Sequence, residues 1–344
     1  MALKDIIGQE KALNILRGCI NKERIPHAIF FAGDEGIGKK LTAINFAKAL
    51  NCTGTSAGAG LFSDGEDGSD EQGIEFRDAC DKCPSCMKID KGSHPDVFTV
   101  IPEGDGGQIT VSAIRQLEES LSYKPFEGEW KIAIIDNADR LNRSAANAFL
   151  KCLEEPSQKS ILILISSRPD TMLATIRSRC QKINFTPLPI DTMSRLLREK
   201  HAEFDHEQAS LLSTLSGGRL GYALNENLIA QRDWSFDIFF QMLGATEDNI
   251  WEDRNAMEEW FEWGQLLLRD IAVYKTTGRA DLLINRDKAD EIKKMSDVSE
   301  LKYILKLSRE FYTIKERLHF NLNKQLTFNY TSLLLKEMLG KKDH

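Results

Sequence analysis

The sequence lacks any apolar run long enough to cross a membrane. The run Ile161–Ile165 is far shorter than the roughly 20 residues that a transmembrane helix needs. The first ten residues carry charges and contain no apolar stretch of the kind found in a signal peptide. We therefore expect a soluble, cytosolic protein with no membrane contact.

The chain also lacks an excess of positive charge. Its formal net charge is −7, whereas a protein that coats nucleic acid needs a concentrated positive field. Any contact with DNA should therefore be local or shared with partners. At 344 residues the chain is long enough for two or three domains.

Cysteine is scarce, and its odd count of seven does not suggest a disulfide framework. Three thiols form the pattern Cys80-x-x-Cys83-x-x-Cys86, and Cys52 can supply a fourth. Four thiolates arranged as a tetrahedron make a structural zinc site. Free thiols are the alternative, and an iron–sulfur cluster would need another spacing. Three further cysteines lie in apolar or helical patterns and are expected in the core: Cys19, Cys152 and Cys180.

The first half of the chain alternates short apolar runs with helix-length amphipathic segments. Strands are expected at Ala28–Ala32, Val97–Ile101, Lys131–Asp136, Ser160–Ser166 and Lys182–Phe185. Helices are expected near Gln9–Asn21, Lys39–Asn51, Ser112–Ser122 and Arg143–Glu155. This alternation predicts an α/β domain, a parallel sheet with helices on both faces and ligands at the carboxyl ends of the strands.

Composition divides the chain into three expected domains. Residues 1–187 should form the α/β domain, with a zinc module at about 52–88 that includes a solvated acidic insertion at 53–79. Residues 188–230 should form a small helical domain. Residues 231–344 should be all-α, with helices near 250–277, 301–318 and 324–339.

A glycine-rich segment directly follows the first expected strand and opens a helix, which is the context of a P-loop. In it, Gly33, Gly36 and Gly38 allow backbone N–H groups to cradle phosphate, and Lys39 can reach the outer phosphates. The next position should be Ser or Thr, whose hydroxyl holds magnesium. Here it is Lys40, whose ammonium group cannot ligate a cation.

The strand Lys131–Asp136 ends in a carboxylate, as a Walker B strand does. Active ATPases of the AAA+ type usually follow this aspartate with a glutamate that polarises the attacking water, but Asn137 stands there and cannot act as a base. Two residues that ATP hydrolysis normally requires are thus replaced. The sequence leaves open whether this chain binds ATP and Mg²⁺. The plain alternative is a strand-to-helix turn that binds nothing.

Several short motifs together resemble the clamp-loader branch of the AAA+ proteins. These are Ser178-Arg179-Cys180 after the expected fourth strand, Leu153-Glu154-Glu155-Pro156 before it, His27-Ala28 and Ile7-Gly8-Gln9. The matching motifs are concentrated in the first half of the chain. The second half resembles the family only in its length and helical pattern. It implies an AAA+ P-loop domain with a zinc-module insertion, a helical lid domain and a helical collar that holds subunits in a ring.

The resemblance also implies roles for individual residues. Arg179 would be a trans-acting arginine finger for ATP bound by the neighbouring subunit, whereas Arg177 is better explained by a salt bridge. Ser166 and Ser167 lie where a polar sensor residue ends the fourth strand, and Tyr222 stands where the family's sensor arginine is expected. The partners implied are motor (tau/gamma-like) and delta-like subunits in a hetero-pentameric ring, the sliding clamp, and primed DNA reached through the complex.

Three functions fit these observations. The first is a ring subunit that has lost ATP chemistry and acts on a neighbour, so the chain itself would not be a competent ATPase. The second is an active motor subunit of a clamp loader, or a related replication or repair AAA+ motor, in which Lys40 is a tolerated variant; Asn137 argues against it. The third is a zinc-dependent DNA-binding protein, which the net negative charge disfavours.

Overall fold

The computed structural model describes residues 1–54, 77–103, 107–201, 203–224, 227–243, 251, 253–318 and 322–339. The chain divides into two compact units. The first comprises Met1–Leu188 and Arg219–Tyr222, and the second comprises Pro189–Gly218 and Ala223–His344. Most of the expected acidic insertion, residues 55–76, lies outside the described residues.

The first unit is built on a parallel sheet of order β2-β3-β4-β1-β5. The strands are β1 (Ala28–Ala32), β2 (Val97–Val100), β3 (Lys131–Ile135), β4 (Ser160–Ser166) and β5 (Gln181–Asn184). Every residue of β1, β3 and β4 is buried, as expected for strands covered on both faces. All five lie where the sequence predicted strands.

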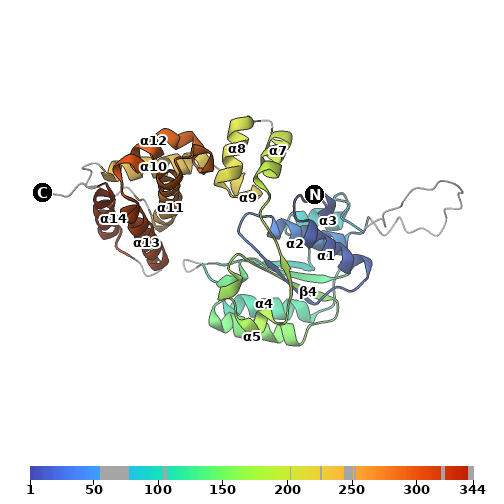
Figure 1. Ribbon diagram of the computed structural model, residues 1–344. Coiled ribbons are helices and arrows are strands. Elements are labelled where there is room, and N and C mark those ends of the chain that lie inside the picture. The colour runs from blue at the N-terminus through green and yellow to red at the C-terminus, as the bar shows by residue number, and fades with distance from the viewer. Residues whose placement is uncertain are drawn as a thin grey trace, which may run out of the picture. The chain divides into compact units, whose positions relative to one another are not determined.

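Helices cover both faces of this sheet (Figure 1). The helices of this unit are α1 (Glu10–Asn21), α2 (Lys39–Asn51), α3 (Pro84–Asp90), α4 (Val111–Ser122), α5 (Arg143–Glu154) and α6 (Ala174–Arg177), with short turns η1 (Leu3–Asp5), η3 (Ala138–Arg140) and η4 (Pro169–Thr171). Because side chains alternate along a strand, Ile29 and Phe31 join one core with α1 and α2. Phe30 joins the other core with α4 and α5.

The second unit is helical in its described residues. Its helices are α7 (Ile190–Lys200), α8 (His206–Leu215), α10 (Leu228–Leu243), α11 (Arg254–Thr277), α12 (Ala289–Val298), α13 (Leu301–Arg317) and α14 (Lys324–Met338), with turns η5 (Ala280–Leu282) and η6 (Arg286–Lys288). The short α9 (Leu220–Ala223) spans the boundary between the units. Trp251, Trp260, Phe261 and Phe311 pack together in the core of the second unit.

The expected fold class is thus confirmed: a parallel α/β domain followed by helices. The finer division into a lid domain at 188–230 and a collar domain at 231–344 stays a prediction. Among the described residues, no helix is both long and apolar enough to span a membrane.

Candidate functional site

The P-loop, the Walker B aspartate and the predicted sensor serines all lie at one edge of the sheet. The P-loop follows β1, Asp136 follows β3, and Ser166 ends β4. These three strands are adjacent and parallel, so their carboxyl ends meet at the edge where such folds bind ligands. The residues singled out for nucleotide chemistry therefore come together in space.

The P-loop turns through backbone conformations that favour glycine. Gly36 and Gly38 have φ of 76° and 93°, and Gly33 has φ of 150°. Gly38 is the N-cap of α2. The loop therefore ends at the N-terminus of a helix, as a phosphate-binding loop does. The glycine pattern in the sequence thus corresponds to a P-loop backbone.

Lys39 is turned onto the carbonyl groups of its own loop. Its Nζ donates to the carbonyl oxygen of Gly33 at 2.6 Å and to that of Asp34 at 2.5 Å. Only 6% of the residue is exposed. Burial lowers the pKa of Lys39, while surrounding carboxylates, Glu35 foremost, act to raise it.

Lys40 pairs with the Walker B aspartate. Its Nζ lies 3.0 Å from Oδ2 of Asp136. In an active P-loop ATPase the hydroxyl at the Lys40 position and the carboxylate at the Asp136 position both serve magnesium. Here the ammonium group itself neutralises the carboxylate, so the two magnesium positions are joined by an ion pair.

Asn137 adopts a left-handed backbone conformation, with φ of 53° and ψ of 51°. Asparagine tolerates this region better than glutamate, because its short polar side chain bonds locally. The structure thus adds a conformational reason for asparagine at a position where an active ATPase carries a catalytic glutamate.

Ser166 is engaged by a carboxylate that the sequence analysis did not consider. Its hydroxyl donates to Oδ1 of Asp139 at 2.6 Å and accepts the N–H of Arg168 at 2.9 Å. Ser166 is fully buried, and Ser167 beside it is half-buried. This contact could have been suspected from the sequence, because Asp139 lies only three residues after Asp136 and so near the carboxyl end of the neighbouring strand β4.

Residues 219–222 pack directly on the P-loop. The N–H of Gly221 donates to the carbonyl oxygen of Gly36 at 2.8 Å, and a Cβ on Gly36 would come within 2.8 Å of the Tyr222 nitrogen. The side chain of Tyr222 stacks against the guanidinium of Arg219, 4.2 Å from the ring centre. The position predicted to replace a sensor arginine therefore lies at the loop, but presents an aromatic ring.

Arg179 follows α6 and lies at the surface of the first unit. Its Nη2 is 2.8 Å from Oε1 of Glu154, and its Nη1 donates to the carbonyl oxygen of Thr175 at 3.0 Å. Its side chain is 39% exposed, which leaves it accessible to another molecule. Arg177 instead forms the salt bridge expected for it, with Asp170 at 3.1 Å.

The four predicted cysteine ligands form one cluster. The Sγ atoms of Cys52, Cys80, Cys83 and Cys86 all lie within 4.8 Å of one another. The Sγ atoms of Cys52 and Cys83 are 3.9 Å apart, and tetrahedral bonds of about 2.3 Å to zinc place sulfur atoms about 3.8 Å apart. The donor set therefore fits a tetrahedral metal ion.

Backbone groups around the cluster support thiolates. Cys80 N–H donates to the sulfur of Cys52 at 3.4 Å, and Cys83 and Cys86 N–H groups donate to the preceding ligand sulfurs at 3.3 and 3.4 Å. Burial acts to raise the pKa of Cys83, but hydrogen bonds from Thr53 and Cys86 prevail and lower it to about 5. A Cβ on Gly54 would lie 2.7 Å from the Cys80 sulfur, so only glycine fits there.

A buried carboxylate fixes the loop that borders this module. Asp96 is 0% exposed and accepts the N–H groups of Phe126, Glu127 and Gly128 at 2.7, 2.8 and 2.8 Å. Burial acts to raise the pKa of Asp96, but these three hydrogen bonds lower it below its ordinary value. The Glu127 carboxylate then binds Lys88 of α3 at 2.7 Å, which ties the loop to the cysteine module.

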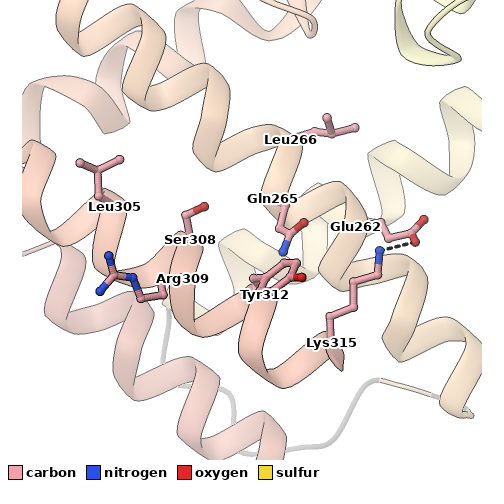
Figure 2. Close-up of a pocket in the computed structure, with 8 residues that line it drawn as sticks. All are labelled: Glu262, Gln265, Leu266, Leu305, Ser308, Arg309, Tyr312 and Lys315. Carbon is pink, nitrogen blue, oxygen red and sulfur yellow. Dashed lines mark hydrogen bonds and ion pairs between the residues drawn. The ribbon is translucent and has the colours of Figure 1, made fainter. Parts of the chain in front are cut away.

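The second unit contains a shallow groove between α11 and α13, shown in Figure 2. Lys315 and Glu262 form an ion pair of 2.6 Å at one end of it, and Leu305 and Tyr312 are more than half exposed. Among the described residues that line it, no cluster of nucleophilic or metal-binding groups is found.

Comparison with known proteins agrees with this geometry. The family model described as DNA polymerase III, delta subunit, matches residues 8–189. The DNA polymerase III subunit delta′ of Bacillus subtilis is 28% identical over 342 residues, which is 96% of each chain. The delta′ subunit of Pseudomonas aeruginosa is 34% identical over 197 residues, 56% of this chain and 53% of that protein. Subunit tau of Salmonella typhimurium is 30% identical over 253 residues, 71% of this chain but only 36% of tau.

The parallel sheet, the glycine loop after β1 and the carboxylate after β3 define a P-loop protein of the AAA+ class. Within that class, the matched family model and the full-length similarity to a delta′ subunit favour delta′ over tau, which is similar to only part of this chain. The chain belongs to the delta′ family of clamp-loader subunits of DNA polymerase III.

Proposed function

We propose that this chain is a non-hydrolysing clamp-loader subunit that helps to load the sliding clamp onto primed DNA and supplies Arg179 to the ATPase site of a neighbouring subunit. The observation that carries the first part is the ion pair between Lys40 and Asp136. An ammonium group on the Walker B carboxylate removes the charge that would attract magnesium. Without the metal, the charge that develops on a transferred phosphoryl group has no partner.

Three further contacts support loss of turnover. Lys39 is bound to carbonyl groups of its own loop, and Ser166 is bound to Asp139. Gly36 is held by Gly221. The first two contacts occupy the ammonium and hydroxyl groups that would otherwise meet a triphosphate and its attacking water, and the third packs residues 219–222 against the loop.

The exposed guanidinium of Arg179 supports the second part. A planar guanidinium on the γ-phosphate of a neighbour's ATP neutralises charge in the transition state, an effect of roughly 10³–10⁵ in rate for such fingers. In the proposed ring, motor subunits bind and hydrolyse ATP, and this chain and a delta-like subunit complete the ring. Entry of primed DNA places the arginine fingers at the neighbouring ATPase sites, and the clamp closes after hydrolysis. The complex would act in the cytoplasm.

Zinc is the metal that we propose for Cys52, Cys80, Cys83 and Cys86. All four positions would be filled by thiolates, so the ion would have no open site for catalysis and would stabilise the module only. We also propose that the helices of residues 231–344 form the collar. The exposed apolar side chains Leu305, Tyr312, Leu326 and Leu333 favour contact with other proteins.

An active motor is the competing function, because the similarity to tau extends over most of this chain. Steady-state ATPase assays of the chain alone, of motor subunits alone, and of the assembled complex with clamp and primed DNA separate the two. The proposal requires no turnover by the chain alone and a higher turnover per motor subunit once the chain is added. Hydrolysis by the isolated chain would make it a motor instead.

A further inference from the structure

The guanidinium of Arg179 makes one contact through each of its two terminal nitrogens in the described part of the chain. Glu154 binds Nη2 at 2.8 Å, and the Thr175 carbonyl oxygen binds Nη1 at 3.0 Å. An arginine side chain has five N–H donors, so these two contacts leave three donors for an anion. Both partners lie within the first unit, on α5 and α6.

The backbone that carries each partner is fixed by packing. Glu154 is the last residue of α5, and its neighbour Leu153 is buried in the core with Phe149. Thr175 lies next to Ile176, which is 1% exposed in the same core. Arg179 is therefore held by one backbone carbonyl and by one carboxylate whose backbone is fixed.

The neighbouring arginine shows that this contact is particular to Arg179. Arg177, two residues earlier, binds Asp170 at 3.1 Å, so each arginine has its own acidic partner. Glu155 follows Glu154 directly and is exposed, but the described contacts of Arg179 do not include it. The chain thus provides a matched carboxylate as a control.

We infer that Glu154 is a positioning residue for Arg179, an inference that rests on the proposed role of Arg179 as a trans-acting finger. An arginine on a long stem samples many rotamers, and each one that points away from the neighbour's phosphate is unproductive. Glu154 and the Thr175 carbonyl restrict the guanidinium to rotamers that contact both groups, and the remaining N–H donors are then available to the phosphate of the neighbour.

Glu154 also brings a negative charge close to the incoming phosphate, and this opposes the positioning effect. Its side chain is 51% exposed, so water and salt screen that charge strongly. We therefore expect orientation to outweigh repulsion, so that loss of Glu154 slows hydrolysis. The loss is modest, because an exposed ion pair contributes little energy.

A double-mutant cycle tests this in the clamp loader reconstituted with motor subunits, clamp and primed DNA. The variants are Glu154→Ala, Glu154→Gln, Arg179→Ala and the Glu154→Ala/Arg179→Ala double variant, with Glu155→Ala as the control. We expect Glu154→Ala to lower kcat by about two- to fivefold with KM for ATP unchanged. Glu154→Gln keeps an oxygen acceptor and should recover part of the loss. In the double variant, Glu154→Ala should cause no further loss.

The outcomes separate this inference from the proposed function. If Arg179→Ala slows the complex but Glu154→Ala behaves like Glu155→Ala, the positioning role is wrong and the finger stands. The same conclusion follows if Glu154→Ala slows the complex equally with and without Arg179, since Glu154 then acts by another route. If Arg179→Ala has no effect, the proposed finger itself is wrong. Gel filtration of each complex shows whether the variants assemble.

Discussion

The side chains of Lys40 and Asp136 meet at 3.0 Å at the carboxyl edge of the parallel sheet. One stands at the P-loop position that normally offers a hydroxyl to magnesium, and the other at the end of the Walker B strand. The substitution of Lys40 for a hydroxyl residue thus does two things: it removes one metal ligand and neutralises another. This relationship is the physical basis for expecting no ATP turnover by this chain.

Lys40→Thr is expected to improve binding of Mg·ATP by about tenfold over the wild-type chain, a gain of about 1.4 kcal/mol. The substitution supplies a hydroxyl ligand and frees the Asp136 carboxylate. It should not disturb the fold, because the Lys40 side chain is 51% exposed and exposed ion pairs stabilise by about 1 kcal/mol or less. Titration calorimetry with Mg·ATP measures the effect.

Lys40→Ala is the matched control, since it frees Asp136 without adding a ligand and should bind Mg·ATP more weakly than Lys40→Thr. Equal affinity of wild type and Lys40→Thr would show that the ion pair does not govern metal binding.

Zinc should bind at about one ion per chain, and Cys83→Ser should lose most of it. Because zinc binds thiolates, its affinity should also fall as the pH is lowered. Metal content after dialysis, measured by atomic emission, and thermal unfolding with and without a chelator test this.

Cys19→Ser removes a thiol that lies outside the cluster and should retain full zinc content. If chelation removes the metal without lowering the unfolding temperature, the site does not have the structural role proposed for it.

Asp96→Asn should destabilise the first unit by about 2 kcal/mol at pH 7, because an amide cannot accept three N–H groups as a carboxylate does. The pKa of Asp96 is lower in the folded state than its ordinary value near 4. Its contribution to stability is therefore complete above about pH 4 and is lost as the pH falls through the folded-state pKa. Urea unfolding of both chains at several pH values checks this.

Asp170→Asn changes a carboxylate that is 95% exposed, so its unfolding curve should match that of wild type at pH 7. If Asp96→Asn unfolds at the same urea concentration as wild type at every pH, the three hydrogen bonds do not stabilise the loop.

The sheet and the P-loop could be predicted from the sequence because both have local signatures. Strands buried on two faces give apolar runs such as Ile161–Ile165, and the glycines needed for the loop are close together. The cysteine cluster was equally accessible, since three of its ligands lie within one short segment.

The partners of the site residues could not be predicted in the same way. Glu154 meets Arg179, and Gly221 meets Gly36, only because the fold brings distant segments together. The ion pair of Lys40 depends on the pairing of β1, β4 and β3 in the sheet. In the second unit, helical periodicity predicted the helices, but their packing depends on the shapes of large side chains such as Trp260.

The most direct test of the account is the ATPase rate, at saturating ATP, of the clamp loader assembled with wild-type chain, Arg179→Ala or Arg177→Ala, in the presence of clamp and primed DNA. Arg177 is the matched control, since it is an arginine of the same segment with its own partner, Asp170. We predict that Arg179→Ala lowers kcat at the adjoining site by at least about 1,000-fold and that Arg177→Ala changes it less than about twofold. Equal rates for Arg179→Ala and wild type, in complexes of equal composition, would contradict it.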